Sequence, residues 1–380
     1  MRDTPWHNFD FWLMGAVILL TIFGITMIRS AIAGNIELIE TNTVQKQIIF
    51  AVGGFVVAMV TAAIDYRLWA SLSRILYWGM VGVLVLLNAV GNQLFGSNRW
   101  FRLGPILIQP SELAKIVIIL ILADFFTRHQ QKISKLSWVV RSFILTLGIA
   151  IWILLQPDLS TSIVIFVLWF ALVWASGLEI KHLVIAGAIS AVSLAVSIPL
   201  LIISYDPTKT DSLIKPYQIE RIINFVLPDP DARHGAIYNV RQALVSIGSG
   251  GWVGQGYESG TQVQLRFLKV RHSDFIFSAM AEEFGFVGTV LVMGLLLFII
   301  LRCLRAARMS SDTFGALIAY GVATLLTFQA VVNIGMNLNL LPVTGLPLPF
   351  ISYGGSSLLS MLLGIGLVES VILRHKALEF

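Results

Sequence analysis

The sequence predicts an all-α polytopic membrane protein, and its composition, hydropathy and apolar run lengths lead to that fold class. The chain has 380 residues, of which 57% are hydrophobic and 12% are charged, and its mean hydropathy is +0.83. A soluble domain carries roughly 25% charged residues, so this chain lacks the side chains that would cover a water-soluble surface. Apolar runs recur at about the 20 residues that span a bilayer. We therefore expect residues 1–380 to form a single transmembrane domain.

Ten segments have the length and composition of a membrane-spanning helix. They are 11–33, 47–65, 75–91, 110–127, 138–156, 159–176, 182–204, 274–304, 313–339 and 351–374. Only Gln156, Pro157 and Asp158 separate the fifth from the sixth, and proline favours a break there over one long bent helix. The first segment is long enough to span and lacks a small-residue cleavage site, which favours a retained helix over a signal peptide.

The distribution of Lys and Arg sets the predicted orientation. With the N-terminus in the cytoplasm, the termini and short loops on that side hold 13 basic residues, and the short outer connections hold three. Both termini are then cytoplasmic. The net charge of +5 reflects these basic loops rather than binding of nucleic acid, and the single cysteine, Cys303, excludes an intrachain disulfide.

A long polar segment, 205–273, falls on the outer face between the seventh and eighth spans. It is too long for a simple connector. Apolar residues at helical intervals in 222–226 and 238–247 predict short amphipathic helices on the membrane surface. The glycines of 248–251 then predict a sharp turn, because glycine tolerates positive φ. A second glycine-rich outer loop lies at 341–357.

Ionisable residues near the outer ends of the spans are candidate functional residues, because a charge inside a bilayer needs a partner. Glu112 and Lys115 follow Pro110, which suits the first position of a helix, and they can pair as i, i+3 neighbours. Asp158 follows the predicted helix break. A structural ion pair is the alternative for the first site, and a helix cap is the alternative for Asp158.

Asp274 is the third candidate, at the point where the long loop enters the eighth span. Asp274 or Ser273 would serve as an N-cap of that helix, which is the structural alternative. Glu282 and Glu283 lie deeper in the same helix, and we expect them to meet Lys115 or backbone donors rather than lipid. These residues predict an outward-facing cavity with carboxylates and cations. Such a cavity is compatible with both transport and catalysis.

Ordered motifs along the chain resemble those of a known family. They are QPSE at 109–112, QPDL at 156–159, IGSGG at 247–251, GQG at 254–256, GTQ at 260–262, HSDFIF at 272–277, AEEFG at 281–285, NIGM at 333–336, PVTGLPLP at 342–349 and SYGGS at 352–356. With them the chain resembles the SEDS family of bacterial cell-wall proteins. The PVTGLPLP segment and the short termini resemble the RodA branch, of cell elongation, more than the FtsW branch, of division.

The resemblance implies a ten-helix peptidoglycan glycosyltransferase that polymerises lipid II on the outer face of the cytoplasmic (inner) membrane during cell wall biogenesis. It also implies a class B penicillin-binding protein as partner, which supplies the transpeptidase. The family's essential aspartate, in a His-Thr-Asp-Phe motif, maps to Asp274, with serine in place of threonine. Asp158, Glu112 and Lys115 map to other family motifs. Where relatives read Leu-Pro-Glu-Arg-His, this chain reads LKVRH at 268–272, which leaves the local loop path open.

The implied reaction requires a base for the acceptor hydroxyl and positive charge for the leaving group. An α-linked donor that yields a β-1,4 product implies inversion by one in-line attack, with a base on the acceptor side, and we expect Asp274 to be that base. The leaving pyrophosphate needs positive charge, for which the outer-face candidates are Lys115, Arg99 and Arg102. Mg²⁺ held by Asp158 or Glu112 would serve the same purpose, although the sequence contains no definite ligand set. For Arg99 and Arg102 the alternative is snorkelling to membrane lipid headgroups.

Other function classes also fit a membrane protein with an outward cavity. A lipid II flippase should have pseudo-symmetric halves, and the sequence contains no internal repeat. A non-catalytic activator of a penicillin-binding protein would not need ionisable groups around a cavity. A lipid-linked polysaccharide ligase would share the architecture and the chemistry, and only the family motifs argue against it.

Overall fold

The computed structural model describes residues 5–33, 36–90, 92–94, 97–103, 106–130, 136–177, 225–226, 235–268 and 270–375. The seventh predicted span, 182–204, lies outside the described residues, as does nearly all of 205–234. Residues 225–226 are helical, but the rest of the helix predicted at 222–226 falls outside this description. The helix predicted at 238–247 is present as part of a longer one, α10 (Gly235–Ser249).

Nine of the ten predicted spans correspond to helices in the described residues. They are α1 (Phe11–Ile32), α3 (Thr43–Ala63), α4 (Tyr66–Val90), α5 (Pro110–Arg128), α6 (Leu136–Leu155), α7 (Leu159–Ala175), α12 (Ile276–Met309), α13 (Thr313–Asn337) and α14 (Gly355–Leu373). Seven of the described helices are long and apolar enough to cross a membrane. The two others are α7, which has 17 residues, and α5, in which 19 residues include four charged ones.

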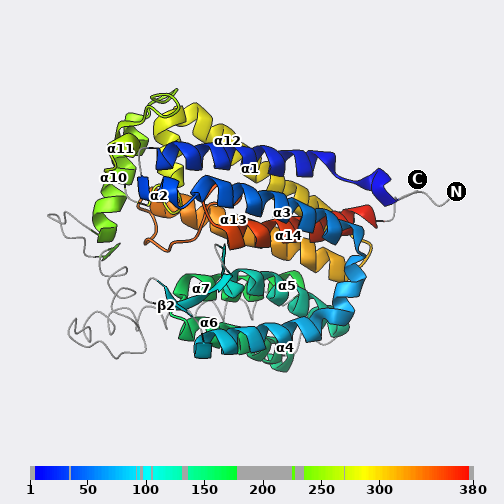
Figure 1. Cartoon of the computed structure of the whole chain (residues 1–380). Helices are drawn as coiled ribbons and strands as arrows, with labels where there is room; N and C mark the ends of the chain where they lie inside the picture. Colours follow the sequence, from blue (N-terminus) through cyan, green and yellow to red (C-terminus); the bar gives the residue numbers. More distant parts are fainter. Residues whose placement is uncertain are drawn as a thin grey trace.

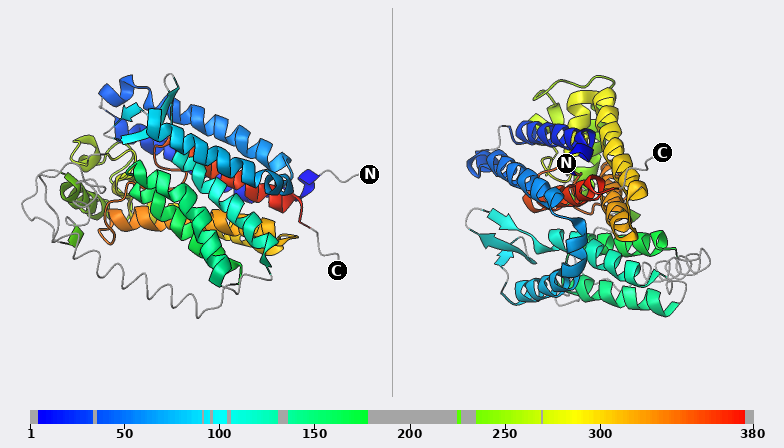
Figure 2. Two further views of the ribbon diagram at one scale, coloured as in Figure 1. Left: turned by 90° about the horizontal axis from the view of Figure 1, so that it is seen from below. Right: turned by 90° about the vertical axis from the view of Figure 1, so that its right-hand side faces the viewer.

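The helices form two groups that are visible in Figure 1. One group contains α1, α3, α12, α13 and α14, and the other contains α4, α5, α6 and α7. The groups meet where α5 and α7 pack on α13. The short helices η1 (Pro5–Asn8), α2 (Ile36–Glu40) and α11 (Thr261–Gln264) complete the helical elements. η1 and the last turn of α14 lie at one end of the bundle, and α10 and α11 lie at the other (Figures 1 and 2).

Aspartates begin three of the spanning helices. The carboxylate of Asp10 accepts from Leu13 N at the start of α1, at 3.0 Å. Asp158 caps α7 and Asp312 caps α13 in the same way. Each cap satisfies an amide that has no partner within its own helix. The chain breaks between α6 and α7 at the predicted place.

A small antiparallel sheet between α4 and α5 was not predicted. Its strands are β1 (Asn92–Leu94), β2 (Ser97–Leu103) and β3 (Ile106–Ile108), in the order β1-β2-β3. The strands are short and have no regular alternation of apolar and polar residues, so hydrophobic periodicity does not reveal them. β2 contacts α4 and α5, which places Arg99 and Trp100 against the second helix group.

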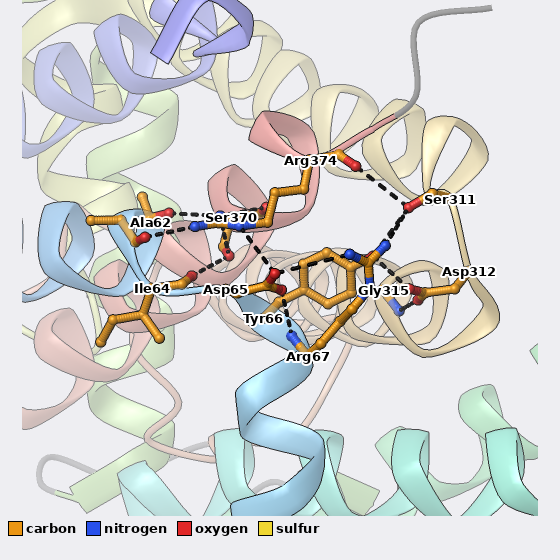
Figure 3. Close-up of polar contacts among 11 residues, drawn as sticks. Ala62, Ile64, Asp65, Tyr66, Arg67, Ser311, Asp312, Gly315, Ser370 and Arg374 are labelled. Atoms are coloured by element: carbon orange, nitrogen blue, oxygen red, sulfur yellow. Dashed lines mark hydrogen bonds and ion pairs between the residues drawn. The ribbon is translucent and has the colours of Figure 1, made fainter. Parts of the chain in front are cut away.

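A polar cluster joins the helix groups at the end that carries η1 (Figure 3). Asp312 accepts from Tyr66 Oη at 2.6 Å and from Arg67 Nε at 3.0 Å. Arg374, at the end of α14, donates to Ala62 O at 3.0 Å. Because α4 begins at Tyr66, these bonds fix the point at which the chain passes from the first helix group to the second.

The helix α12 contains a break that accommodates the outer loop. Gly285 has φ 64° and ψ −165° inside the helix. The amides that follow it find acceptors in the loop after α10, because Phe286 N donates to Gly251 O at 2.9 Å and Val287 N donates to Trp252 O at 3.1 Å. The break therefore replaces lost helical hydrogen bonds with bonds to the loop.

Substituting Gly285 by alanine should destabilise the fold. A Cβ at this position would lie 2.3 Å from Gly254 N and 2.7 Å from Trp252 O, at a backbone angle that L-residues disfavour. We expect Gly285→Ala to lower the unfolding free energy by about 1–3 kcal/mol or more, measured as a lower Tm in detergent. Gly294→Ala in the same helix is the control, because its Cβ would meet no atom within 4 Å. Equal Tm values for the two variants would contradict this account.

Candidate active site

A cavity of about 490 Å³ lies between the two helix groups. Segments from both groups line it: β2, the first turns of α5 and α7, the turn before α12, and the loop between α13 and α14. Of the six predicted site residues, four are among the lining residues: Arg99, Glu112, Asp158 and Asp274. They come from four separate segments of the sequence, so the fold assembles the cavity that the charged residues predict.

The other two predicted residues do not line the cavity. Lys115 is 1% exposed and its Nζ lies 2.6 Å from Glu112 Oε2. The predicted i, i+3 pair is therefore present, with Lys115 beneath the carboxylate that faces the cavity. Arg102 is exposed on β2, three residues after Arg99 and so on the opposite side of the strand, and it is not part of the lining.

Asp158 is a hub of hydrogen bonds at the start of α7. Its Oδ1 accepts from Thr161 N at 3.2 Å, and its Oδ2 accepts from Thr161 Oγ1 at 3.0 Å, Gln109 Nε2 at 2.9 Å and Ser111 Oγ at 3.4 Å. Arg99 Nη1 lies 3.9 Å from Oδ1. The helix cap considered as an alternative is thus confirmed, and the same carboxylate also joins the start of α5 to the start of α7.

The side chains around the cavity do not form a Mg²⁺ site. In the described part of the chain, no group of three or more His, Cys, Asp or Glu side chains is arranged to hold a metal ion. The oxygens of Asp158 already accept four hydrogen bonds, and Glu112 pairs with Lys115. Mg²⁺ needs oxygen ligands that are available to it in octahedral geometry, so we derive no step through a metal ion.

Asp274 lies in the turn before α12 and does not cap that helix. The N-cap residue is Phe275, and its side chain makes no capping hydrogen bond, so the cap by Asp274 or Ser273 that was considered as the structural alternative is absent. The cap comes from α13, since Asn337 Oδ1 accepts from Ser278 N at 3.2 Å and from Ser278 Oγ at 2.6 Å. An acceptor oxygen from another helix thus replaces the local cap.

Two asparagines of α13 hold Asp274 in place through its main chain. Asn333 Nδ2 and Asn337 Nδ2 donate to Asp274 O at 3.2 and 3.0 Å. Asn333 Nδ2 also donates to Leu346 O at 2.8 Å, which fixes the loop that passes over the carboxylate. Gly345, at φ 79°, faces that carboxylate, since a Cβ on it would lie 3.6 Å from Asp274 Oδ2. Neither asparagine was among the candidate site residues, which were all ionisable, although Asn333 begins the NIGM motif at 333–336.

The two buried glutamates of α12, Glu282 and Glu283, do not line the cavity and accept hydrogen bonds from other segments of the chain. Glu282 Oε1 accepts from Gln262 N at 2.7 Å, at the start of α11. Glu283 accepts from Ser30 Oγ on α1. The expectation of backbone donors is confirmed for Glu282, and the expectation of a contact with Lys115 is wrong, because Lys115 pairs within its own helix.

His272 is a neutral side chain beside Asp274 at neutral pH. Burial and, to a smaller extent, the charge of the adjacent Arg271 together lower the pKa of His272 to about 4. Its ring lies 5.7 Å from that of Tyr353, and its carbonyl accepts from Tyr353 N at 2.9 Å. His272 therefore supplies no positive charge to the cavity at pH 7.

Comparison with known proteins identifies the family. The family model of cell cycle proteins that covers FtsW, RodA and SpoVE matches residues 11–377. The chain belongs to this family. Among its relatives is the peptidoglycan glycosyltransferase MrdB of Escherichia coli K12, 34% identical over 100% of this chain and 99% of the relative. Another is the probable peptidoglycan glycosyltransferase FtsW of Trichlorobacter lovleyi, 33% identical over 96% of this chain and 93% of the relative.

Solved structures have the same fold. The crystal structure of the rod shape determining protein RodA of Thermus thermophilus matches with a TM-score of 0.69 and 28% identity, covering 98% of this chain and 100% of that one. A chain from a peptidoglycan synthase complex that coordinates polymerization and crosslinking matches with a TM-score of 0.76 and 31% identity, over 96% and 97% of the two chains. The predicted polytopic helical fold and the resemblance to the SEDS family are confirmed.

The two arginines of β2 should differ in their effect on stability. Arg99 Nε donates to Gln156 O at 2.9 Å and its Nη2 donates to Pro157 O, so it holds the sheet against the turn between α6 and α7. Arg102 is exposed. We expect Arg99→Ala to lower the unfolding free energy by about 1–3 kcal/mol and Arg102→Ala to change it little, measured as Tm in detergent. A larger loss with Arg102→Ala would contradict the assignment.

His272 should make stability depend on pH. A histidine with an ordinary pKa of about 6.5 when unfolded and about 4 when folded binds more protons in the unfolded chain between these values. Stability should therefore fall as the pH drops from about 6.5 to 4 and level off below, by on the order of 1–3 kcal/mol. His272→Gln should reduce this slope in Tm measurements from pH 7 to pH 4. An unchanged slope in the variant would show that other groups control it.

Proposed function

We propose that this chain polymerises lipid II into β-1,4 glycan strands on the outer face of the cytoplasmic membrane, with Asp274 as the general base. Family membership and full-length similarity to its named relatives make the chain a peptidoglycan glycosyltransferase. The observation that supports the assignment of the base is that Asp274 borders the cavity between the helix groups, with its main chain fixed by α13.

In this proposal, Asp274 acts on the acceptor sugar. In the proposed step, the 4-hydroxyl oxygen of the acceptor attacks the anomeric carbon of the donor, and the bond from that carbon to the pyrophosphate oxygen breaks. The hydroxyl proton passes to the carboxylate of Asp274. One displacement of this kind inverts the anomeric centre, which accounts for a β-linked product from an α-linked donor.

Arg99 is the lining residue best placed to meet the leaving pyrophosphate. Arg99 is one of the lining residues, and its side chain is 23% exposed. Positive charge held at the leaving oxygen lowers the barrier as negative charge develops there. Lys115 would act indirectly, by setting the position and charge of Glu112, since its ammonium group lies behind that carboxylate.

Apolar residues at the cavity favour a lipid-linked substrate. Leu159 and Ile163 line the cavity one turn apart on α7, and they are 37% and 41% exposed. In a membrane-spanning helix, such side chains face lipid. A polyprenyl chain can therefore leave the cavity along this face of α7 while the sugar and pyrophosphate remain among the polar residues.

The proposed protein partner and the proposed role in the cell are based on the similarity of this chain to known proteins. The match to a chain of a synthase complex that coordinates polymerization and crosslinking supports a class B penicillin-binding protein as partner of this chain. The similarity to RodA and MrdB, together with the segment at 342–349, supports a role in cell elongation. Basic residues at the end of the bundle with η1 and the end of α14 support a cytoplasmic location for both termini.

Removing the carboxylate of Asp274 should abolish polymerisation. We expect Asp274→Asn and Asp274→Ala to lower the rate of glycan synthesis by at least about 100-fold without lowering the Tm. The measurement is glycan formation from labelled lipid II by the purified chain with its penicillin-binding partner, the transpeptidase being blocked by a β-lactam. Products are resolved by length.

Glu40→Gln is the matched control, because Glu40 is an exposed carboxylate that is not part of the cavity. It should retain wild-type activity. Wild-type turnover by Asp274→Asn would remove Asp274 from the mechanism. Transfer of lipid II across vesicles without glycan formation by the wild-type chain would favour a flippase instead.

A further inference from the structure

A second cavity lies at the opposite end of the bundle from Asp274. It has a volume of about 410 Å³ and is bounded by η1, the first turn of α1, the last turns of α12 and the end of α14. Two arginines and two histidines are in its lining, Arg302, Arg305, His7 and His375, against one carboxylate, that of Asp10. None of these residues has a part in the proposed reaction.

The two arginines of this cavity have different surroundings. Arg302 Nε donates to Asp10 Oδ2 at 2.7 Å, so its charge is largely offset. Arg305 is exposed, one turn further along α12, and makes no hydrogen bond or ion pair with any residue that the structure describes. Among the described residues, the cavity therefore presents one guanidinium without an ion-pair partner, a group that matches the oxygens of a phosphate in a bidentate way.

Exposed apolar side chains continue from the cavity along α1. Phe11 and Trp12 are part of the lining and are 72% and 75% exposed. Ile18 and Ile22, which follow Phe11 by seven and eleven residues, are 40% and 58% exposed and lie on the same face of α1. Because α1 is long and apolar enough to span a membrane, this face meets lipid chains, with Trp12 at the level where tryptophan prefers the interface.

We infer that this cavity binds the headgroup of an anionic phospholipid. The phosphate pairs with Arg305, and the acyl chains lie along the exposed face of α1 that begins at Phe11. A soluble phosphate would satisfy the guanidinium, but it would leave Phe11 and Trp12 without a role. The combination of an unpaired cation with an adjoining apolar face fits a ligand that is anionic at one end and apolar at the other.

The test compares two lipids that differ only in headgroup. The purified full-length chain is titrated with phosphatidylglycerol or with phosphatidylcholine of identical acyl chains, and bound lipid is counted by native mass spectrometry. We expect phosphatidylglycerol to bind at lower concentration, and Arg305→Gln to raise the concentration for half-occupancy about tenfold. Arg305→Lys should lose less, because it keeps the charge.

Arg308→Gln is the matched control, since Arg308 is an exposed arginine of the same helix that is not in the lining. It should change binding by less than about twofold, the change expected for diffuse attraction at the surface. Equal binding of the two lipids, or equal losses with Arg305→Gln and Arg308→Gln, would overturn the proposal. If Arg305→Gln lowers the Tm, the comparison of the two lipids on the wild type and on Arg305→Lys decides.

A competition experiment separates a lipid headgroup from a soluble phosphate. Glycerol 3-phosphate or inorganic phosphate at millimolar concentration should leave bound phosphatidylglycerol in place, because neither compound has an acyl chain to contact α1. Displacement at such concentrations would assign the cavity to a soluble phosphate compound and overturn the inference of a lipid.

Discussion

A carboxylate at a helix break beside the membrane must find hydrogen-bond donors, and Asp158 finds them on two helices. Water is scarce in this setting, so an unsatisfied carboxylate would strongly destabilise the fold. Thr161 on its own helix and Gln109 and Ser111 at the start of α5 supply the donors. Arg99 holds the adjacent carbonyls at 156 and 157. Satisfying one charge thus brings together the first turns of two helices and a strand, and these form one wall of the cavity.

The opposite wall depends on neutral donors. Asn333 and Asn337 carry no charge, so α13 can hold them fully buried while they bond to the main chain around Asp274. These bonds go to the main-chain carbonyl of Asp274. The two walls are linked where Ser160 Oγ donates to Thr344 O at 2.5 Å. Asp274, the proposed base, is therefore positioned through its backbone, whereas the carboxylate of Asp158 accepts hydrogen bonds from neighbouring side chains.

Interactions that are local in the sequence could be predicted, and those that join distant segments could not. Apolar run length located the spans, and Pro110, the Glu112–Lys115 pair and the Asp158 cap follow from neighbours within four residues. The cap of α12 could not be predicted, because its acceptor, on Asn337, lies 59 residues away in the sequence from the donor on Ser278. Arg99 and Arg102 were equivalent in the sequence, and only the register of an unpredicted sheet separates them.

The charges around the cavity restrict how a pyrophosphate can be recognised. Arg99 and Lys115 face Glu112, Asp158 and Asp274, which leaves one excess negative charge if all are ionised. Among the described residues, the cavity therefore has no excess positive charge to attract an anion, and the proposed pyrophosphate would have to be held by short-range donors. Ser357 is a candidate donor, because it lines the cavity and its buried Oγ has no hydrogen-bond partner in the described part of the chain.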